Sequence, residues 1–87
     1  MNLSQNIIQL LMSFGWSERK RDERFIVMRP PSNLGLPDDY FFGVPNNYKA
    51  PGANQVFRHL LGIIVEIYSI SKEDERLQAI EKKIAAL

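Results

Sequence analysis

The sequence predicts an α+β fold: a helix, a three-stranded antiparallel sheet and a second helix, with a further amphipathic helix at the C-terminus. Apolar residues recur at helical spacing in residues 3–14 and again from residue 54 onward. Between these stretches lie three short candidate strands, of which the second and third are rich in β-forming residues. A polar turn separates the first two, and a loop with proline and glycine separates the last two. Sequential strands with short links favour an antiparallel meander.

The size and composition of the chain fit one small globular domain. Its 87 residues are enough for one compact unit and too few for two. There is no cysteine, which excludes disulfides, thiolate metal sites and a cysteine nucleophile. The N-terminal segment lacks the basic region of a signal peptide, and no apolar stretch is long enough to span a bilayer. We therefore expect a cytoplasmic protein without cofactors or membrane contact.

The first helix is expected to span residues 3–14. Its apolar residues share one face, and these are Leu3, Ile7, Leu10, Leu11 and Phe14. Asn2 followed by Gln5 matches the capping box, in which side chains and backbone N–H groups at the start of a helix satisfy one another. Gly15 is the expected stop at the C-terminal end.

Three strands are expected at residues 16–20, 24–29 and 40–44. The prolines at positions 30 and 31 end the second strand, because proline has no N–H to donate to a β-ladder. Pro45 closes the third strand in the same way. The link at residues 21–23 is polar and is expected to form a turn, and the loop at residues 32–39 contains Asn33, Gly35 and Pro37, as loops commonly do.

A long second helix begins at Asn54 and carries a wide apolar stripe, so it is expected to lie across the sheet. Ser71 and Asp74 then mark a new helix start, with Ser71 as the cap. The apolar residues that follow alternate spacings of three and four, which is typical of a coiled-coil seam. We therefore divide the chain into a domain over residues 1–70 and an amphipathic helix over residues 71–87.

The C-terminal helix needs a partner for its apolar stripe, since an isolated helix of this length is marginal in water. The stripe can pack back onto its own domain or dock against another chain. The pattern continues to the last residue, which favours self-association or binding of another protein. The candidate interface residues are Leu77, Ile80, Ile84 and Leu87.

Basic residues in the first hairpin and around the start of the long helix are the candidates for binding nucleic acid, because they can neutralise phosphates. They are Arg19, Lys20, Arg21, Arg24, Arg29, Lys49 and Arg58. Glu18, Asp22 and Glu23 are interleaved with them. Alternating charges are more typical of a solvated surface that keeps strand edges from pairing. A solvated hairpin is therefore favoured over a nucleic-acid site.

Aromatic residues in the predicted sheet add a modest indication of a binding surface. Strand alternation places Phe41 on the opposite face from Tyr40 and Phe42, so one face must expose aromatic surface unless something covers it. Such rings can stack with bases, although aromatic residues in a small sheet more often belong to the core.

No catalytic residue or metal site is expected from the sequence. His59 is the single histidine, and its place within the long helix is typical of a surface residue. Asp38 and Asp39 are adjacent carboxylates, but without further ligands they indicate a solvated loop.

Over about residues 3–71, the order of elements resembles HicA-like domains, which share the double-stranded-RNA-binding-like fold. The residues that carry the resemblance are 7–11 leading into 14–16, then 24–30, then 42–45, and the helix from Asn54. HicA toxins cleave RNA with a histidine in a Gly-Ser-His motif at the start of the second strand. Here residues 21–25 read Arg-Asp-Glu-Arg-Phe, with all three motif residues absent. The resemblance thus implies the fold and argues against that nuclease activity.

Three functional hypotheses follow. The first is a non-enzymatic interaction and oligomerisation module, linked to a bacterial toxin–antitoxin or defence system. The second is an RNA- or DNA-binding module that uses the basic hairpin. The third, ranked last, is a divergent HicA-like ribonuclease in which His59 replaces the missing strand histidine.

Overall fold

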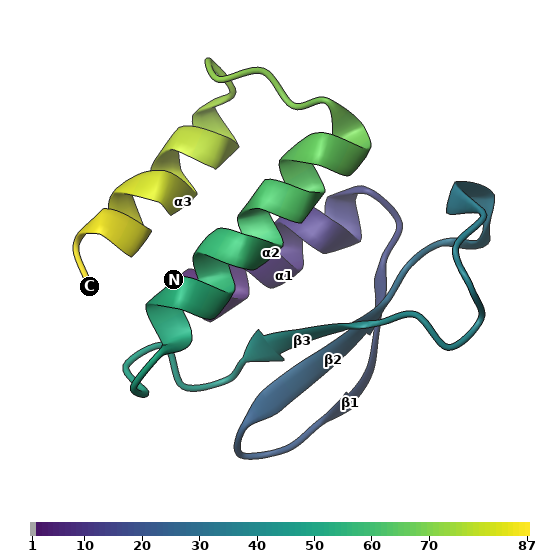
Figure 1. Cartoon of the computed structure of the whole chain (residues 1–87), viewed down its shortest axis with the longest axis horizontal. Helices are drawn as coiled ribbons and strands as arrows, with labels where there is room; N and C mark the ends of the chain where they lie inside the picture. Colours follow the sequence, from purple (N-terminus) through teal and green to yellow (C-terminus); the bar gives the residue numbers. More distant parts are fainter. Residues whose placement is uncertain (1) are drawn as a thin grey trace.

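The computed structural model describes residues 2–87, and Met1 lies outside the described residues. The elements in chain order are α1 (Leu3–Ser13), β1 (Ser17–Arg21), β2 (Phe25–Arg29), the 3-10 helix η1 (Ser32–Leu34), β3 (Phe42–Pro45), α2 (Ala53–Tyr68) and α3 (Glu75–Ala85). The strands form one antiparallel sheet in the order β1-β2-β3 (Figure 1). The predicted α+β class and order of elements are confirmed.

The ends of α1 are formed as the sequence predicts. The Asn2 side chain accepts a hydrogen bond from the Gln5 backbone N–H at 2.9 Å, and the Gln5 side chain accepts one from the Asn2 N–H at 3.0 Å. Gly15 follows the helix with a φ of +95°, a backbone conformation that glycine adopts without a steric penalty. The capping box and the glycine stop are both confirmed.

All three strands begin later than expected, and local turns account for the starts of β1 and β3. The Trp16 N–H donates to the Leu11 carbonyl at 3.1 Å and so continues the end of α1 rather than starting β1. The Tyr40 N–H donates to the Pro37 carbonyl at 3.0 Å, which holds Tyr40 in a turn and leaves Phe42 as the first residue of β3.

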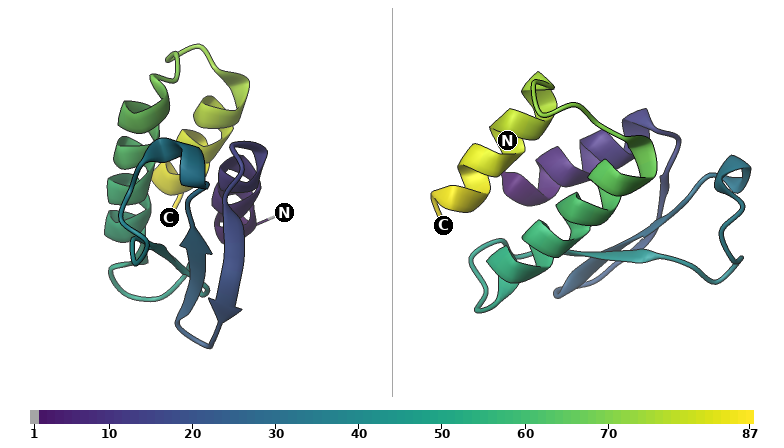
Figure 2. Two further views of the ribbon diagram at one scale, coloured as in Figure 1. Left: turned by 90° about the vertical axis from the view of Figure 1, so that its right-hand side faces the viewer. Right: turned by 45° about the horizontal axis from the view of Figure 1, so that its top comes forward.

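The helices and the sheet form two layers (Figures 1 and 2). Ile26 and Met28 of β2, with Phe42 and Val44 of β3, are buried in the core that α1 and α2 also line. The buried Ser4 hydroxyl donates to the Pro45 carbonyl at 2.6 Å and so ties α1 to the end of β3. We call the helix-covered side of the sheet the inner face and the opposite side the outer face.

Helix α3 packs back onto its own chain and contacts both α1 and α2. Leu77 and Ile80 are each 2% exposed and Ile84 is 5% exposed, so all three belong to the same core as the rest of the domain. The proposed interface of Leu77, Ile80, Ile84 and Leu87 is therefore corrected, because only Leu87 remains exposed. The grooves of α1 and α2 already bury the stripe that the sequence left without a partner.

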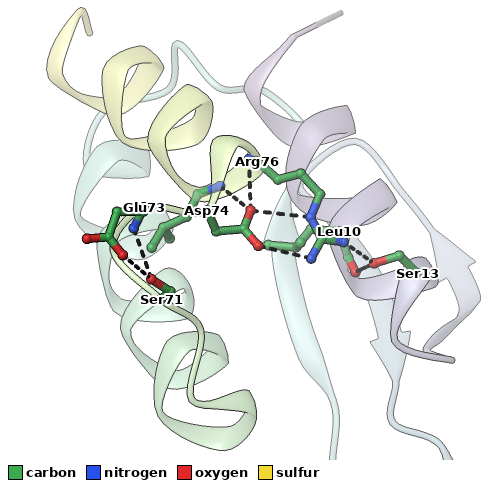
Figure 3. A network of polar contacts seen from close by, with 7 residues as sticks. Leu10, Ser13, Ser71, Glu73, Asp74 and Arg76 are labelled. Carbon is green, nitrogen blue, oxygen red and sulfur yellow. Dashed lines mark hydrogen bonds and ion pairs between the residues drawn. The ribbon is translucent and has the colours of Figure 1, made fainter.

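Asp74, rather than Ser71, caps α3. The Asp74 carboxylate accepts hydrogen bonds from the backbone N–H groups of Arg76 and Leu77, at 2.9 and 3.3 Å. Ser71 instead donates its hydroxyl hydrogen to Glu73 in the preceding loop (Figure 3). A shorter α3 results, because the chain enters helical conformation only at Glu75.

A series of side-chain contacts links the ends of the three helices to Trp16, the residue before β1. The Arg76 guanidinium of α3 lies 5.4 Å from the Phe14 ring centroid, and Arg76 also donates to the Ser13 hydroxyl at 3.2 Å (Figure 3). Phe14 stacks on Tyr68 at the end of α2, with ring centroids 3.9 Å apart. The Tyr68 hydroxyl accepts a hydrogen bond from the Trp16 indole N–H at 2.7 Å.

Across residues 2–87, no helix combines the length and the apolar character that crossing a bilayer requires.

We predict that Ile80→Ala lowers the free energy of unfolding by about 2–5 kcal/mol, because it opens a cavity in the core that α3 shares with α1. Urea denaturation followed by circular dichroism measures the change. Glu81→Ala is the matched control: Glu81 is exposed on the same helix, so its loss should change stability by no more than about 0.5 kcal/mol. Equal stability of both variants would contradict the packing of α3 described above.

We predict that Tyr68→Phe costs about 1–3 kcal/mol of stability, because the buried Trp16 indole N–H loses its acceptor while the Phe14 stack is kept. Tyr48→Phe serves as the control, since it removes a hydroxyl that forms no hydrogen bond within residues 2–87. Thermal or urea unfolding should separate the two variants, and a Tyr68→Phe protein as stable as the parent would count against this contact.

Candidate functional site

The outer face of the sheet is where cationic and aromatic side chains gather. Ile26 and Met28 point to the core, so the alternating residues Phe25, Val27 and Arg29 lie on the outer face. Strand pairing places Lys20 beside Val27 and Ser17 beside Arg29. On the other side, Val27 pairs with Gly43 of β3. The outer face therefore contains two β1–β2 pairs with one basic residue each. Lys20 of β1 lies beside Val27, and Arg29 of β2 lies beside Ser17.

A β-bulge in β1 determines which of its charges reach the outer face. The register shifts between Glu18, which pairs with Met28, and Lys20, which pairs with Val27. Arg19 is the additional residue, so Arg19 and Lys20 together oppose Val27. Regular alternation would have put Glu18 and Lys20 on the same face. The bulge separates them and leaves Glu18 on the inner face.

Glu18 and Arg21 neutralise each other on the inner face. The Arg21 guanidinium donates to the Glu18 carboxylate at 2.6 and 3.3 Å. This hydrogen bonding lowers the pKa of Glu18 and raises the pKa of Arg21. Both residues line a shallow depression together with Met12 of α1. Arg21, a predicted phosphate contact, is thus directed away from the outer face.

Asp22 holds the turn between β1 and β2. Its carboxylate accepts hydrogen bonds from the backbone N–H groups of Arg24 and Phe25, each at 2.8 Å. The Phe25 and Arg24 N–H groups lower the pKa of Asp22, because they stabilise its charged form. Asn46, just after β3, donates to the Asp22 carbonyl at 2.7 Å and so ties the third strand to this turn.

Six of the seven predicted basic residues form no ion pair within residues 2–87, and four of these lie in the β1–β2 hairpin. Among residues 2–87, no ion pair involves Arg19, Lys20, Arg24 or Arg29. The acidic residues that argued against a nucleic-acid site are placed elsewhere: Glu18 lies on the inner face, while Asp22 and Glu23 lie in the turn. Among the residues of the three strands, the outer face therefore carries cations and no carboxylate, while Lys20 and Arg24 lie near enough to Asp22 in the adjacent turn to contribute to its lowered pKa.

Two phenylalanine rings are exposed on this side of the sheet. Phe41 is 57% exposed, and alternation with the buried Phe42 directs it outward, as the sequence indicates. Phe25 is 43% exposed, and its ring lies against Gly43, where an added Cβ would come within 3.4 Å of a ring carbon. Sequence reasoning missed Phe25, because residues 25–28 are all apolar and their alternation is not visible without the structure.

The remaining predicted residues lie away from the outer face. Lys49 is in the loop before α2, with its Nζ 5.6 Å from the Tyr48 ring centroid. Arg58 is exposed on α2, where it lines a shallow groove whose other wall is Glu81, Ile84 and Ala85 of α3. The structure therefore does not bring Arg58 together with the hairpin.

The residues weighed for catalysis are on the surface. His59 is exposed on α2, and Asp38 and Asp39 are exposed in the loop before β3. Within the described residues, no group of three or more histidine, cysteine, aspartate or glutamate side chains is arranged to hold a metal ion.

Comparison of the chain with known protein families, with curated proteins and with solved structures finds no match.

Acid is expected to loosen the β1–β2 turn. The pKa of Asp22 lies below its ordinary value of 3.8, so its carboxylate stabilises the turn at any pH above that value. This contribution is lost as the pH falls through the lower pKa of the folded state. An NMR titration should show the Arg24 and Phe25 amide resonances moving together, with an apparent pKa below 3.8.

Asp22→Asn is the control for this titration, because it keeps an acceptor oxygen and cannot ionise. The Arg24 and Phe25 amide resonances should then stay in place over the same pH range. The same titration curve in the variant would show that another group is responsible.

Proposed function

We propose that this protein is a non-enzymatic nucleic-acid-binding module whose outer sheet face contacts phosphates. The observation that carries the proposal is the sorting of charge across the sheet. Arg19, Lys20 and Arg29 lie on or beside the outer face without carboxylate partners, while Glu18 pairs with Arg21 on the inner face. An excess of unpaired cations on one face favours binding of a polyanion, because the polyanion then releases its counterions.

The arrangement also answers the objection raised by the sequence. Residues 17–29 contain five basic and three acidic side chains, a net charge of +2 that looks mixed in linear order. In the folded hairpin Glu18 pairs with Arg21, whereas Arg19, Lys20 and Arg29 form no ion pair among residues 2–87. The phosphate-contacting set is Arg19, Lys20, Arg24 and Arg29, and Arg21 is withdrawn from it by its ion pair.

The hypothesis of an oligomerisation module rested on an apolar α3 stripe in need of a partner. The chain's own core already buries Leu77, Ile80 and Ile84 of that stripe, so the hypothesis has less support. A ribonuclease centred on His59 is also less well supported. His59 is exposed on α2, a helix that covers the inner face, whereas Arg19, Lys20 and Arg29 lie on the strands. The link to HicA-like domains and to a toxin–antitoxin or defence system stays a prediction from the sequence, as does a cytoplasmic location.

The test is binding of labelled RNA and DNA oligonucleotides, measured by fluorescence anisotropy over a range of salt concentrations. We expect affinity to fall with salt, and the double variant Arg19→Ala/Lys20→Ala to bind more weakly at every sequence tested. Loss of two phosphate contacts should reduce the slope of log affinity against log salt by about 2.

Lys72→Ala/Lys82→Ala is the matched control, because it removes two exposed cations from α3 and from the loop before it. It should leave both the affinity and the salt slope close to those of the parent. Binding that does not respond to salt, or a control as weak as the hairpin variant, would overturn the proposal.

A further inference from the structure

We propose that the nucleic acid bound by the outer face is single-stranded, and that its unpaired bases stack on Phe25 and Phe41. This inference rests on the proposed function and adds the class of ligand. Cations alone do not distinguish a single strand from a duplex, since both present phosphates. The exposed rings make that distinction, because a base can stack on a side chain only when it is not enclosed in a helix.

Phe41 is exposed although its aromatic neighbours are used in packing. Tyr40 and Phe42 contact each other, with ring centroids 5.9 Å apart, and Phe42 also contacts Trp16 at 4.5 Å. Within residues 2–87, Phe41 belongs to no ring pair and is 57% exposed. One face of this ring is therefore available to a ligand without any rearrangement of the core.

Phe25 is held in place by the strand beside it. Its ring lies over Gly43, where the lack of a side chain leaves room for an aromatic ring to cross the neighbouring strand. Phe25 is nevertheless 43% exposed. A ring that is supported on one side and open on the other loses little conformational freedom when a base stacks on it.

The two rings and the cations form one continuous track. Phe25 pairs with Pro45 and Val27 pairs with Gly43, so continuing the same register places Phe41 beside Arg29. The Phe25 and Phe41 rows are four residues apart along the strands, about 13 Å at the usual rise of a β-strand. The row between them carries Val27, with Lys20 beside it. A strand of nucleic acid that lies along this track can stack at both ends and place phosphates against Lys20 and Arg29.

The composition of the track favours nucleic acid over a protein partner. The apolar surface consists of Phe25, Val27 and Phe41, and basic residues border it on the β1 side and within β2. Alternating aromatic platforms and cations are the combination with which proteins bind single strands without strong sequence preference. An interface with another protein is expected to have a larger apolar centre and fewer cations.

The experiment compares a labelled single-stranded oligonucleotide with the duplex of the same length at one salt concentration. We expect the single strand to bind more tightly. Phe41→Ala should weaken single-strand binding by about 5- to 150-fold, the range found for loss of one stacked base. It should leave the salt slope unchanged, because no phosphate contact is removed. Duplex binding should be far less affected.

Two further variants separate stacking from other effects. Phe41→Leu keeps apolar surface without a stacking plane and should bind as weakly as Phe41→Ala, whereas Phe41→Trp should restore binding. Met12→Ala removes an exposed apolar side chain from α1, 51% exposed, and should change nothing. Circular dichroism checks that each variant is folded.

Each result decides between the two proposals. A duplex bound as tightly as the single strand, or a Phe41→Leu variant that binds like the parent, would overturn stacking while salt-dependent binding through Arg19 and Lys20 still stood. Failure of the parent protein to bind either form would overturn both the single-strand proposal and the proposed function.

Discussion

The apolar core of this domain lies on one side of a single three-stranded sheet. Ile26, Met28, Phe42 and Val44 point into it, and all three helices contribute to the same cluster. On the other side of β2 the residues that alternate with the core residues lie outside this cluster, with Phe25 exposed and Val27 and Arg29 half-buried. Their identities are not constrained by core packing. The cationic and aromatic character of the outer face is therefore a property of the sequence that the hydrophobic effect does not account for.

Local sequence signals predicted most of the fold, and non-local packing decided the rest. The capping box of Asn2 and Gln5 and the stop at Gly15 depend on neighbouring residues, and both are confirmed. Whether the apolar stripe of α3 packs on its own chain depends on a groove between α1 and α2. The local sequence pattern of α3 does not show whether that groove exists. Leu77, Ile80 and Ile84 are equally compatible with a second chain and with the protein's own core until the helices are placed.

The residues of the outer face could be predicted only in part, because their placement also depends on non-local structure. Arg19, Lys20 and Arg29 could be selected by their charge, but the side of the sheet each one occupies depends on strand register. One additional residue in β1 exchanges the faces of all the residues that follow it. The bulge at Arg19 therefore places Arg21 on the inner face with Glu18, and Lys20 on the outer face. Simple alternation along β1 would assign Lys20 and Arg21 to the opposite faces.

Core and outer face are built from alternate residues of the same short strands, so the two sets can vary separately. Substitutions at exposed outer-face positions such as Lys20 or Phe41 leave the buried side chains of Ile26 and Met28 in place, and replacement at an exposed strand position costs about 1 kcal/mol or less. Natural selection or a combinatorial library can therefore change the chemistry of the outer face while the core stays the same. A small sheet covered by helices on one face is a scaffold whose other face can diverge rapidly while its architecture persists.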